Sequence, residues 1–125
     1  MKKEFLTKAK QNIRGAELLF ENDLYDASAN RAYYAALQAA VAALAHAGIK
    51  TDRVSHERTQ ANFTAELIRK RKVYPSRLKS YLPDLQRIRD DADYKSKFVS
   101  KKVASRQLRK ATEFVTKVKQ EVENV

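Results

Sequence analysis

Cysteine is absent from this sequence, and glycine and proline occur only twice each among its 125 residues. Without cysteine, a disulfide framework and a thiolate metal site are both excluded. Glycine and proline supply most tight turns, so their scarcity argues against a β-rich fold. Alanine, leucine, lysine, arginine and glutamine are abundant instead, and all five are good helix formers. The composition therefore predicts an all-α protein.

Long hydrophobic runs are also missing. The longest apolar stretch, residues 35–45, is interrupted by Gln38 and is much shorter than the ~20 residues of a membrane-spanning helix. Near the amino end, Lys8, Lys10 and Arg14 interrupt the apolar positions, so there is no secretory hydrophobic segment. Together with the lack of cysteine, these features predict a soluble cytoplasmic protein without a membrane partner.

Apolar side chains recur at steps of three and four residues, which is the spacing of one face of a helix. Short connections join the amphipathic segments, without an internal repeat or a long linker, so we expect one helical domain over residues 1–125. Such segments pack as an antiparallel up-and-down bundle, here of four long helices and a shorter one. The expected helices cover residues 3–22, 24–47, 56–71 and 76–95, and the last begins after Ser100 as its N-cap.

The second expected helix lies at the centre of the bundle. Eleven of the residues in 27–47 are alanine, and such a helix lets its neighbours approach closely from several sides. Gly48 follows it as a natural C-terminal cap. Pro83 lies inside the fourth helix, where we expect a kink or a restart. The bulky stripe of the second helix consists of Tyr33, Leu37, Val41 and Leu44.

Acidic residues are too few to balance the basic ones, and the formal net charge is +11. Residues 1–60 contribute only +2, from nine Lys/Arg and seven Asp/Glu, whereas residues 61–125 contribute +9, from seventeen and eight. A basic half of this kind favours a polyanionic partner such as a nucleic acid, a nucleotide or an acidic protein. The alternative is a solvated surface that its charge keeps soluble. The residues expected to contact phosphates are Arg69, Lys70, Arg71, Lys72, Lys102, Arg106 and Arg109.

Three polar residues of the second helix, Arg31, Tyr34 and Gln38, are spaced to share one face. A tyrosine beside an arginine can stack on a base or bind a phosphate, which makes Arg31 and Tyr34 candidates for ligand binding. The alternative is that Tyr33 and Tyr34 lie at the edge of the core with their hydroxyl groups at water.

Arg89 borders the apolar stripe of the fourth helix, between Leu85 and Ala92. We expect its guanidinium to be partly buried and held by a carboxylate, with Asp93 or Asp26 as the partner. From the residues alone, a structural role and a role in ligand binding both stay open for this side chain.

Histidine occurs only at positions 46 and 56. We expect His56 to start the third helix and to pack against a neighbouring helix, because no cysteine or cluster of carboxylates accompanies it as a metal ligand. A glycine-rich phosphate-binding loop is also absent. We therefore expect neither a metal nor a cofactor.

Two segments are the most distinctive: Arg-Ala-Tyr-Tyr-Ala at residues 31–35 and Arg-Asp-Asp-Ala-Asp-Tyr at residues 89–94. With smaller matches over nearly the whole chain, they resemble the HEPN superfamily (higher eukaryotes and prokaryotes nucleotide-binding domain) in its small stand-alone prokaryotic form. The resemblance implies an up-and-down helical bundle that forms a homodimer. It also implies a minimal nucleotidyltransferase as a partner, in some cases within a toxin–antitoxin pair.

Catalytic HEPN members are metal-independent ribonucleases that carry an arginine, four to six further residues and then a histidine. The resemblance assigns the arginine to Arg89 and a neighbouring tyrosine to Tyr94. No histidine occupies residues 92–96, which cover the required spacing from either Arg87 or Arg89. Tyrosine is a poor general base because its reference pKa is about 10.

We therefore expect a non-catalytic binding subunit that engages a nucleotide, an RNA or a nucleotidyltransferase. The alternative is a ribonuclease with a degenerate motif, which would use Arg89 and Tyr94, or His56 brought in from another helix.

Overall fold

The computed structural model describes residues 1–50 and 55–124, and within those residues every regular element is helical. This confirms the predicted all-α fold of four long helices and a shorter one. The long helices of the described residues are α1 (Lys2–Glu21), α2 (Tyr25–His46), α4 (Tyr81–Tyr94) and α5 (Lys101–Glu123), and the shorter one is α3 (His56–Asn62).

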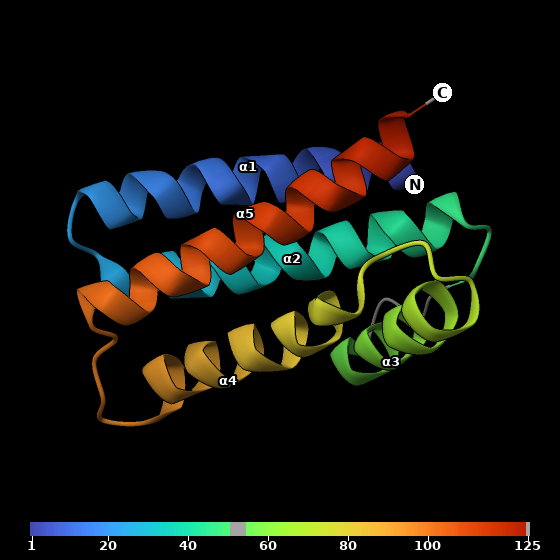
Figure 1. The fold of residues 1–125 in the computed structure, drawn as a ribbon. Helices are drawn as coiled ribbons and strands as arrows, with labels where there is room; N and C mark the ends of the chain where they lie inside the picture. The colour runs from blue at the N-terminus through green and yellow to red at the C-terminus, as the bar shows by residue number, and fades with distance from the viewer. Residues whose placement is uncertain (51–54, 125) are drawn as a thin grey trace.

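The helices form a bundle around α2. Helices α1 and α2 run antiparallel side by side, α5 lies across both of them, and α4 packs along α2 and α5 (Figure 1). Helix α3 packs near the carboxyl end of α2, and the two ends of the chain lie at this same end of the bundle. None of the described helices has the length and apolar character to cross a bilayer.

Alanine lets the other helices pack closely against α2, as predicted. On its α1 side, the hydroxyl of Ser28 donates to the carbonyl oxygen of Ala16 at 2.8 Å, so a side chain of α2 touches the backbone of α1. The predicted bulky stripe is buried too, with Tyr33 and Leu44 at 0% exposure. The alanines of α2 with an exposed fraction of 2% or less are Ala29, Ala32, Ala35, Ala36, Ala39, Ala40, Ala42 and Ala43.

The ends of α1 and α2 are closed by the same backbone motif. Gly48 has φ = +76°, and its N–H and that of Ile49 donate to the carbonyls of Ala45 and Leu44. This pair of bonds satisfies carbonyl groups that would otherwise lack a partner, and it confirms the predicted cap. Asp23 closes α1 in the same way, with φ = +63°. Aspartate adopts this conformation less readily than glycine.

The third and fourth predicted helices each contain an irregular part. Helix α3 continues directly into η1 (Phe63–Lys70), which is a π-helix. The fourth begins as a short 3₁₀ segment, η2 (Ser76–Ser80), and becomes α-helical only at Tyr81. Pro83 is thus the third residue of α4, where a backbone N–H would have no partner within the helix. This confirms the predicted restart.

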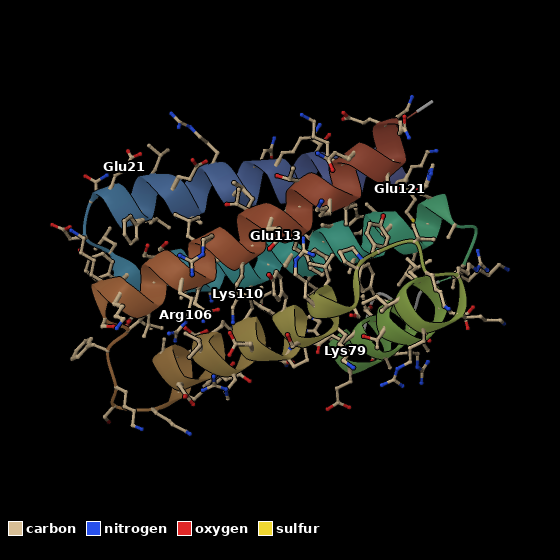
Figure 2. The ribbon with its side chains drawn as sticks, viewed as in Figure 1. Glu21, Lys79, Arg106, Lys110, Glu113 and Glu121 are labelled. Atoms are coloured by element: carbon tan, nitrogen blue, oxygen red, sulfur yellow. The ribbon has the colours of Figure 1, made fainter. Side chains whose placement is uncertain are left out.

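Polar side chains hold η2 and α4 against α5. Asp84 accepts a hydrogen bond from Lys110 at 2.8 Å. Arg77 forms an ion pair with Glu113, whose second oxygen accepts the hydroxyl of Tyr81 at 2.6 Å. Figure 2 shows Lys110 and Glu113 on the same part of α5. The carboxylates of Asp84 and Glu113 therefore link η2 and α4 to α5.

Candidate functional site

Arg89 of α4 lies among aromatic rings, and its side chain is only 15% exposed. The centroids of the rings of Tyr33, Tyr34 and Tyr94 are 5.9, 5.2 and 5.7 Å from the guanidinium carbon. One guanidinium nitrogen also donates to the hydroxyl of Tyr34 at 2.9 Å. Arg31 lies over the same Tyr34 ring at 5.0 Å. The four predicted ligand-binding residues therefore meet in one cluster, and we call Arg31, Tyr33, Tyr34, Arg89 and Tyr94 the tyrosine–arginine cluster.

Two carboxylates offset the charge of Arg89. Asp93 Oδ2 lies 3.0 Å from its Nε, and Asp90 Oδ1 lies 3.1 Å from its Nη1. Asp93 was one of the two partners expected from the sequence. The other expectation, Asp26, is wrong, because its carboxylate accepts the backbone N–H of Val99 at 2.7 Å. Asp26 thus holds the connection between α4 and α5 instead.

Arg31 connects the cluster to the other helices. It donates twice to the amide oxygen of Asn30, at 3.0 and 2.6 Å, and Asn30 in turn donates to Asp93 at 3.1 Å. On α1, Asn12 accepts from Arg31 at 3.2 Å and donates to Gln38 at 2.6 Å. The polar face predicted for α2 is therefore part of a hydrogen-bond network that joins α1, α2 and α4.

The cluster has no excess positive charge. The two arginines, Arg31 and Arg89, are balanced by the carboxylates of Asp90 and Asp93. A phosphate would have to compete with these carboxylates for the guanidinium of Arg89, since like charges repel at this range. The geometry thus favours a structural role for Arg89.

His56 reaches the same cluster from α3. Its Nδ1 lies 3.1 Å from the hydroxyl of Tyr33, and its ring packs edge-on against Tyr34 with centroids 6.0 Å apart. Burial raises the pKa of Tyr33 to about 12, so its phenol stays protonated and can donate to His56. Gln60 donates to the same phenol oxygen at 3.5 Å. The predicted packing of His56 against a neighbouring helix is therefore confirmed.

Within residues 1–50 and 55–124, no three histidine, aspartate or glutamate side chains are grouped so as to hold a metal ion. The other histidine, His46, is the last residue of α2, and its Nδ1 lies 3.1 Å from the ammonium group of Lys2.

The four cations predicted to contact phosphates at residues 69–72 differ in whether a carboxylate lies beside them. Lys70 and Arg71 lie 3.9 and 4.0 Å from Glu66, and Arg71 also donates to the backbone carbonyl of Ala47, the residue after α2. Arg69 and Lys72 have no carboxylate of the described residues within 4.0 Å. Only two of the four cations are therefore without a counter-charge.

The cations of α5 are mostly without a counter-charge as well. Residues 61–124 hold seventeen Lys/Arg, of which seven form ion pairs with six of the eight carboxylates in that part of the chain. A seventh carboxylate, that of Glu123, pairs with Lys10 of α1. Ten cations are left, and the predicted Lys102, Arg106 and Arg109 are among them. Arg106 and the paired Lys110 lie on the same stretch of α5 (Figure 2).

The fold and the cluster together define a helical-bundle domain in which α4 packs an arginine onto a tyrosine pair of the central helix. The chain belongs to the HEPN domain family, whose sequence profile matches residues 3–122 and so covers parts of all the helices described above. The family is associated with ribonuclease and nucleotide-related roles. No curated protein matches the sequence.

Proposed function

We propose that this chain is a non-catalytic HEPN subunit that binds RNA through the basic surface of α5. The observation that carries the proposal is the excess of positive charge in residues 61–124, where ten lysines and arginines have no carboxylate of the described residues within 4.0 Å. Arrays of lysine and arginine of this kind contact phosphates without reading the base sequence. Lys102, Arg106 and Arg109 recur along one helix, so they can contact successive phosphates of a strand.

Two observations support a binding role without cleavage. No histidine follows Arg87 or Arg89 at the spacing of the catalytic motif. In addition, the guanidinium of Arg89 already contacts Asp90, Asp93 and the hydroxyl of Tyr34. A catalytic arginine has to stabilise charge on the phosphate, whereas this one is held by the protein.

The test is RNA binding measured by fluorescence anisotropy at several salt concentrations. The double variant Arg106→Gln/Arg109→Gln should bind single-stranded RNA about tenfold more weakly, and the slope of log K against log salt should fall by roughly 1.4. The control is Lys70→Gln/Lys95→Gln, which removes the same charge from cations beside Glu66 and Asp91. Equal losses in both variants, or binding that does not depend on salt, would contradict the proposal.

The same proposal includes a homodimer and a minimal nucleotidyltransferase as a partner. An apolar corner between the α1–α2 turn and the α4–α5 connection supports an interface, because Phe98 is 93% and Leu24 53% exposed there. These side chains, with Tyr25, Ala27 and Val99, line a cavity of about 350 Å³. Co-purification with a nucleotidyltransferase encoded beside this chain tests the second partner.

A second candidate function is a metal-independent ribonuclease, and one observation favours it. His56 comes from α3 to the tyrosines that contact Arg89, so an imidazole and an arginine lie on the same cluster without the sequence motif. The imidazole could act as a general acid or base. RNA cleavage by the wild type in the presence of chelator, lost in a folded His56→Ala variant, would favour this function over the non-catalytic one.

A further inference from the structure

Helix α3 is attached to the bundle differently from the segment that follows it. Thr59 is the only buried residue of α3, and its hydroxyl donates to the carbonyl of Ser55 in the same turn. The next segment, η1, buries Phe63, Leu67 and Ile68. Because burial of apolar surface is the main force that holds helices together, η1 is anchored in the core, whereas the docking of α3 depends on polar contacts.

Those polar contacts meet at one phenol. His56 Nδ1 lies 3.1 Å from the hydroxyl of Tyr33 on α2, and the amide of Gln60 reaches the same oxygen at 3.5 Å. Gln60 also donates to Gln86 of α4 at 2.7 Å. Tyr33 itself is 0% exposed, so its hydroxyl has to find its partners within the protein.

The bond between Tyr33 and His56 requires a neutral imidazole. The Tyr33 phenol stays protonated and donates to Nδ1, which can accept only while it carries no proton. Protonation of His56 turns Nδ1 into a second donor that faces the phenol. If Tyr33 then accepts from the imidazolium, its own proton loses its acceptor, and a buried O–H group without an acceptor is unfavourable.

The charges of α4 do not favour an imidazolium at this place. The guanidinium of Arg89 lies 5.9 Å from the centroid of the Tyr33 ring, so a charged His56 would add a second cation nearby. Asp90 acts together with burial to raise the pKa of Tyr33, and its charge therefore reaches the site. However, Asp90 and Asp93 already pair with Arg89, at 3.1 and 3.0 Å.

The surroundings on α2 and α3 have the same effect. The Tyr34 ring, which could attract a cation, already has the guanidinium groups of Arg31 and Arg89 over it at 5.0 and 5.2 Å. His56 is the first residue of α3, where the free N–H groups of a helix disfavour positive charge. The adjacent carboxylate of Glu57 is exposed and is screened by water.

We propose that His56 is a proton-operated latch, in which the neutral imidazole holds α3 on Tyr33 and protonation releases α3 while η1 stays packed. Histidine is the side chain whose charge ordinarily changes between pH 5 and 8. The two segments meet at Phe63, where the helix changes from the α to the π form, a change that is common at functional sites. Release uncovers the hydroxyl of Tyr33 and one side of the tyrosine–arginine cluster, and it does not involve the α5 cations.

The experiment follows the ¹⁵N-labelled protein by NMR at pH 7.5 and pH 5.5. Hydrogen exchange gives the protection factor of each amide after correction for its intrinsic rate, and the ring signals of the histidines give their titration. Protection of the α3 amides of residues 59–62 should fall by about tenfold or more at pH 5.5, with a midpoint equal to that of the His56 ring. Amides of residues 36–43 in α2 should change by less than about threefold.

Three variants assign the response to the latch. His56→Gln is neutral at every pH and should make α3 protection independent of pH. His46→Gln is the matched control, since it removes the other histidine and should keep the full response. Tyr33→Phe keeps the buried ring but removes the hydroxyl, so it should lower α3 protection at pH 7.5 and abolish the response. If Tyr33→Phe does not fold, the two histidine variants still decide.

The inference is overturned if the His56 ring does not titrate between pH 7.5 and pH 5.5, or if the response persists in His56→Gln. Titration of His56 without a change in α3 protection also overturns it, because the amides of Gln60 and Gln86 would then have reoriented to accept the phenol proton. Equal losses of protection in α2 and α3 would indicate acid unfolding of the whole bundle instead. None of these measurements contains RNA, so their outcome is independent of the proposed function.

Discussion

At the scale of single residues, Arg89 shows how surroundings decide the role of a charged side chain. The resemblance to the family assigned the motif arginine to Arg89, yet this side chain is mostly buried and faces two carboxylates. Three tyrosine rings surround it, and such rings favour a cation over their faces. The guanidinium of Arg89 therefore interacts with groups of the protein itself. We expect its removal to lower the stability of the fold more than it lowers the affinity for a ligand.

We expect Arg89→Ala to lower the free energy of unfolding by roughly 2–3 kcal/mol. Breaking a fully buried pair costs about 3–5 kcal/mol, and partial exposure of Asp90 and Asp93 reduces this. The comparison is Arg87→Ala, which removes an exposed partner of Asp84 and should cost less than about 1 kcal/mol. Denaturant unfolding of both variants measures the difference. An unchanged stability for Arg89→Ala, together with lost RNA binding, would assign Arg89 to a ligand site instead.

At the scale of the elements, α2 organises the bundle because its small side chains allow close contact. Ala40 is fully buried, and residues around it on α2 have little exposed surface. The same closeness leaves no room for larger groups, since protein interiors are densely packed.

We expect Ala40→Leu to destabilise the protein by about 1–3 kcal/mol, because the added atoms force α2 and its neighbours apart. Ala27→Leu is the matched control on the same helix, since Ala27 is exposed, and it should change stability by less than about 0.5 kcal/mol. Thermal unfolding followed by circular dichroism compares them. A melting temperature for Ala40→Leu equal to that of the control would show that α2 is packed less tightly than described.

The link between α4 and α5 should make the protein sensitive to acid. Burial acts to raise the pKa of Asp84, but hydrogen bonds from Lys110, Gln107 and Arg87 outweigh it, and the pKa lies below its ordinary value of 3.8. A carboxyl whose pKa is lower in the folded state stabilises the fold above pH 3.8. That stabilisation is lost as the pH falls from 3.8 through the lower folded-state pKa.

We therefore expect part of the decline in stability below pH 4 to disappear in Asp84→Asn, because asparagine does not titrate. Urea unfolding between pH 6 and pH 2.5 measures the slope for each protein. The variant should be less stable than the wild type at pH 6, and the gap should narrow toward pH 2.5. A gap that stays constant over this range would exclude Asp84 as a source of the acid sensitivity.

At the scale of the whole molecule, an apolar corner and an excess of positive charge have opposite effects on self-association. Two copies with a formal charge of +11 each repel one another at low salt. Burying Phe98, which is 93% exposed, favours association by about 1.5–3 kcal/mol. Screening by salt should therefore strengthen the proposed dimer, while it should weaken the proposed binding of RNA.

Light scattering at micromolar concentration and physiological salt should give twice the chain mass of 14.4 kDa. Phe98→Ser should shift the mass toward that of one chain, because it removes the most exposed apolar side chain of the corner. Val73→Ser is the control, since Val73 is also exposed but lies on the turn after η1. A wild type that stays monomeric at high concentration, or a dimer unaffected by Phe98→Ser, would contradict this interface.

The sequence by itself determined the helices, the central place of α2 and the family. These properties depend on local spacing: apolar residues at helical steps, alanine content, a glycine after α2 and a proline near the start of α4. Asp93 was likewise predictable as a partner of Arg89, because residues four apart on a helix lie one above the other. The π-helical form of η1 carries no comparable pattern in the sequence.

Only the tertiary structure decided which distant side chains meet. His56 reaches Tyr33 across 23 residues, and Asp26 turned out to bind Val99 rather than Arg89. The structure also placed Lys70 and Arg71 beside Glu66. It brought Lys79 to a cavity that Arg69 and Lys72 also line. Such contacts depend on how helices are placed against one another, and the pattern within a single helix specifies its buried face but not the residue of another helix that comes to lie opposite.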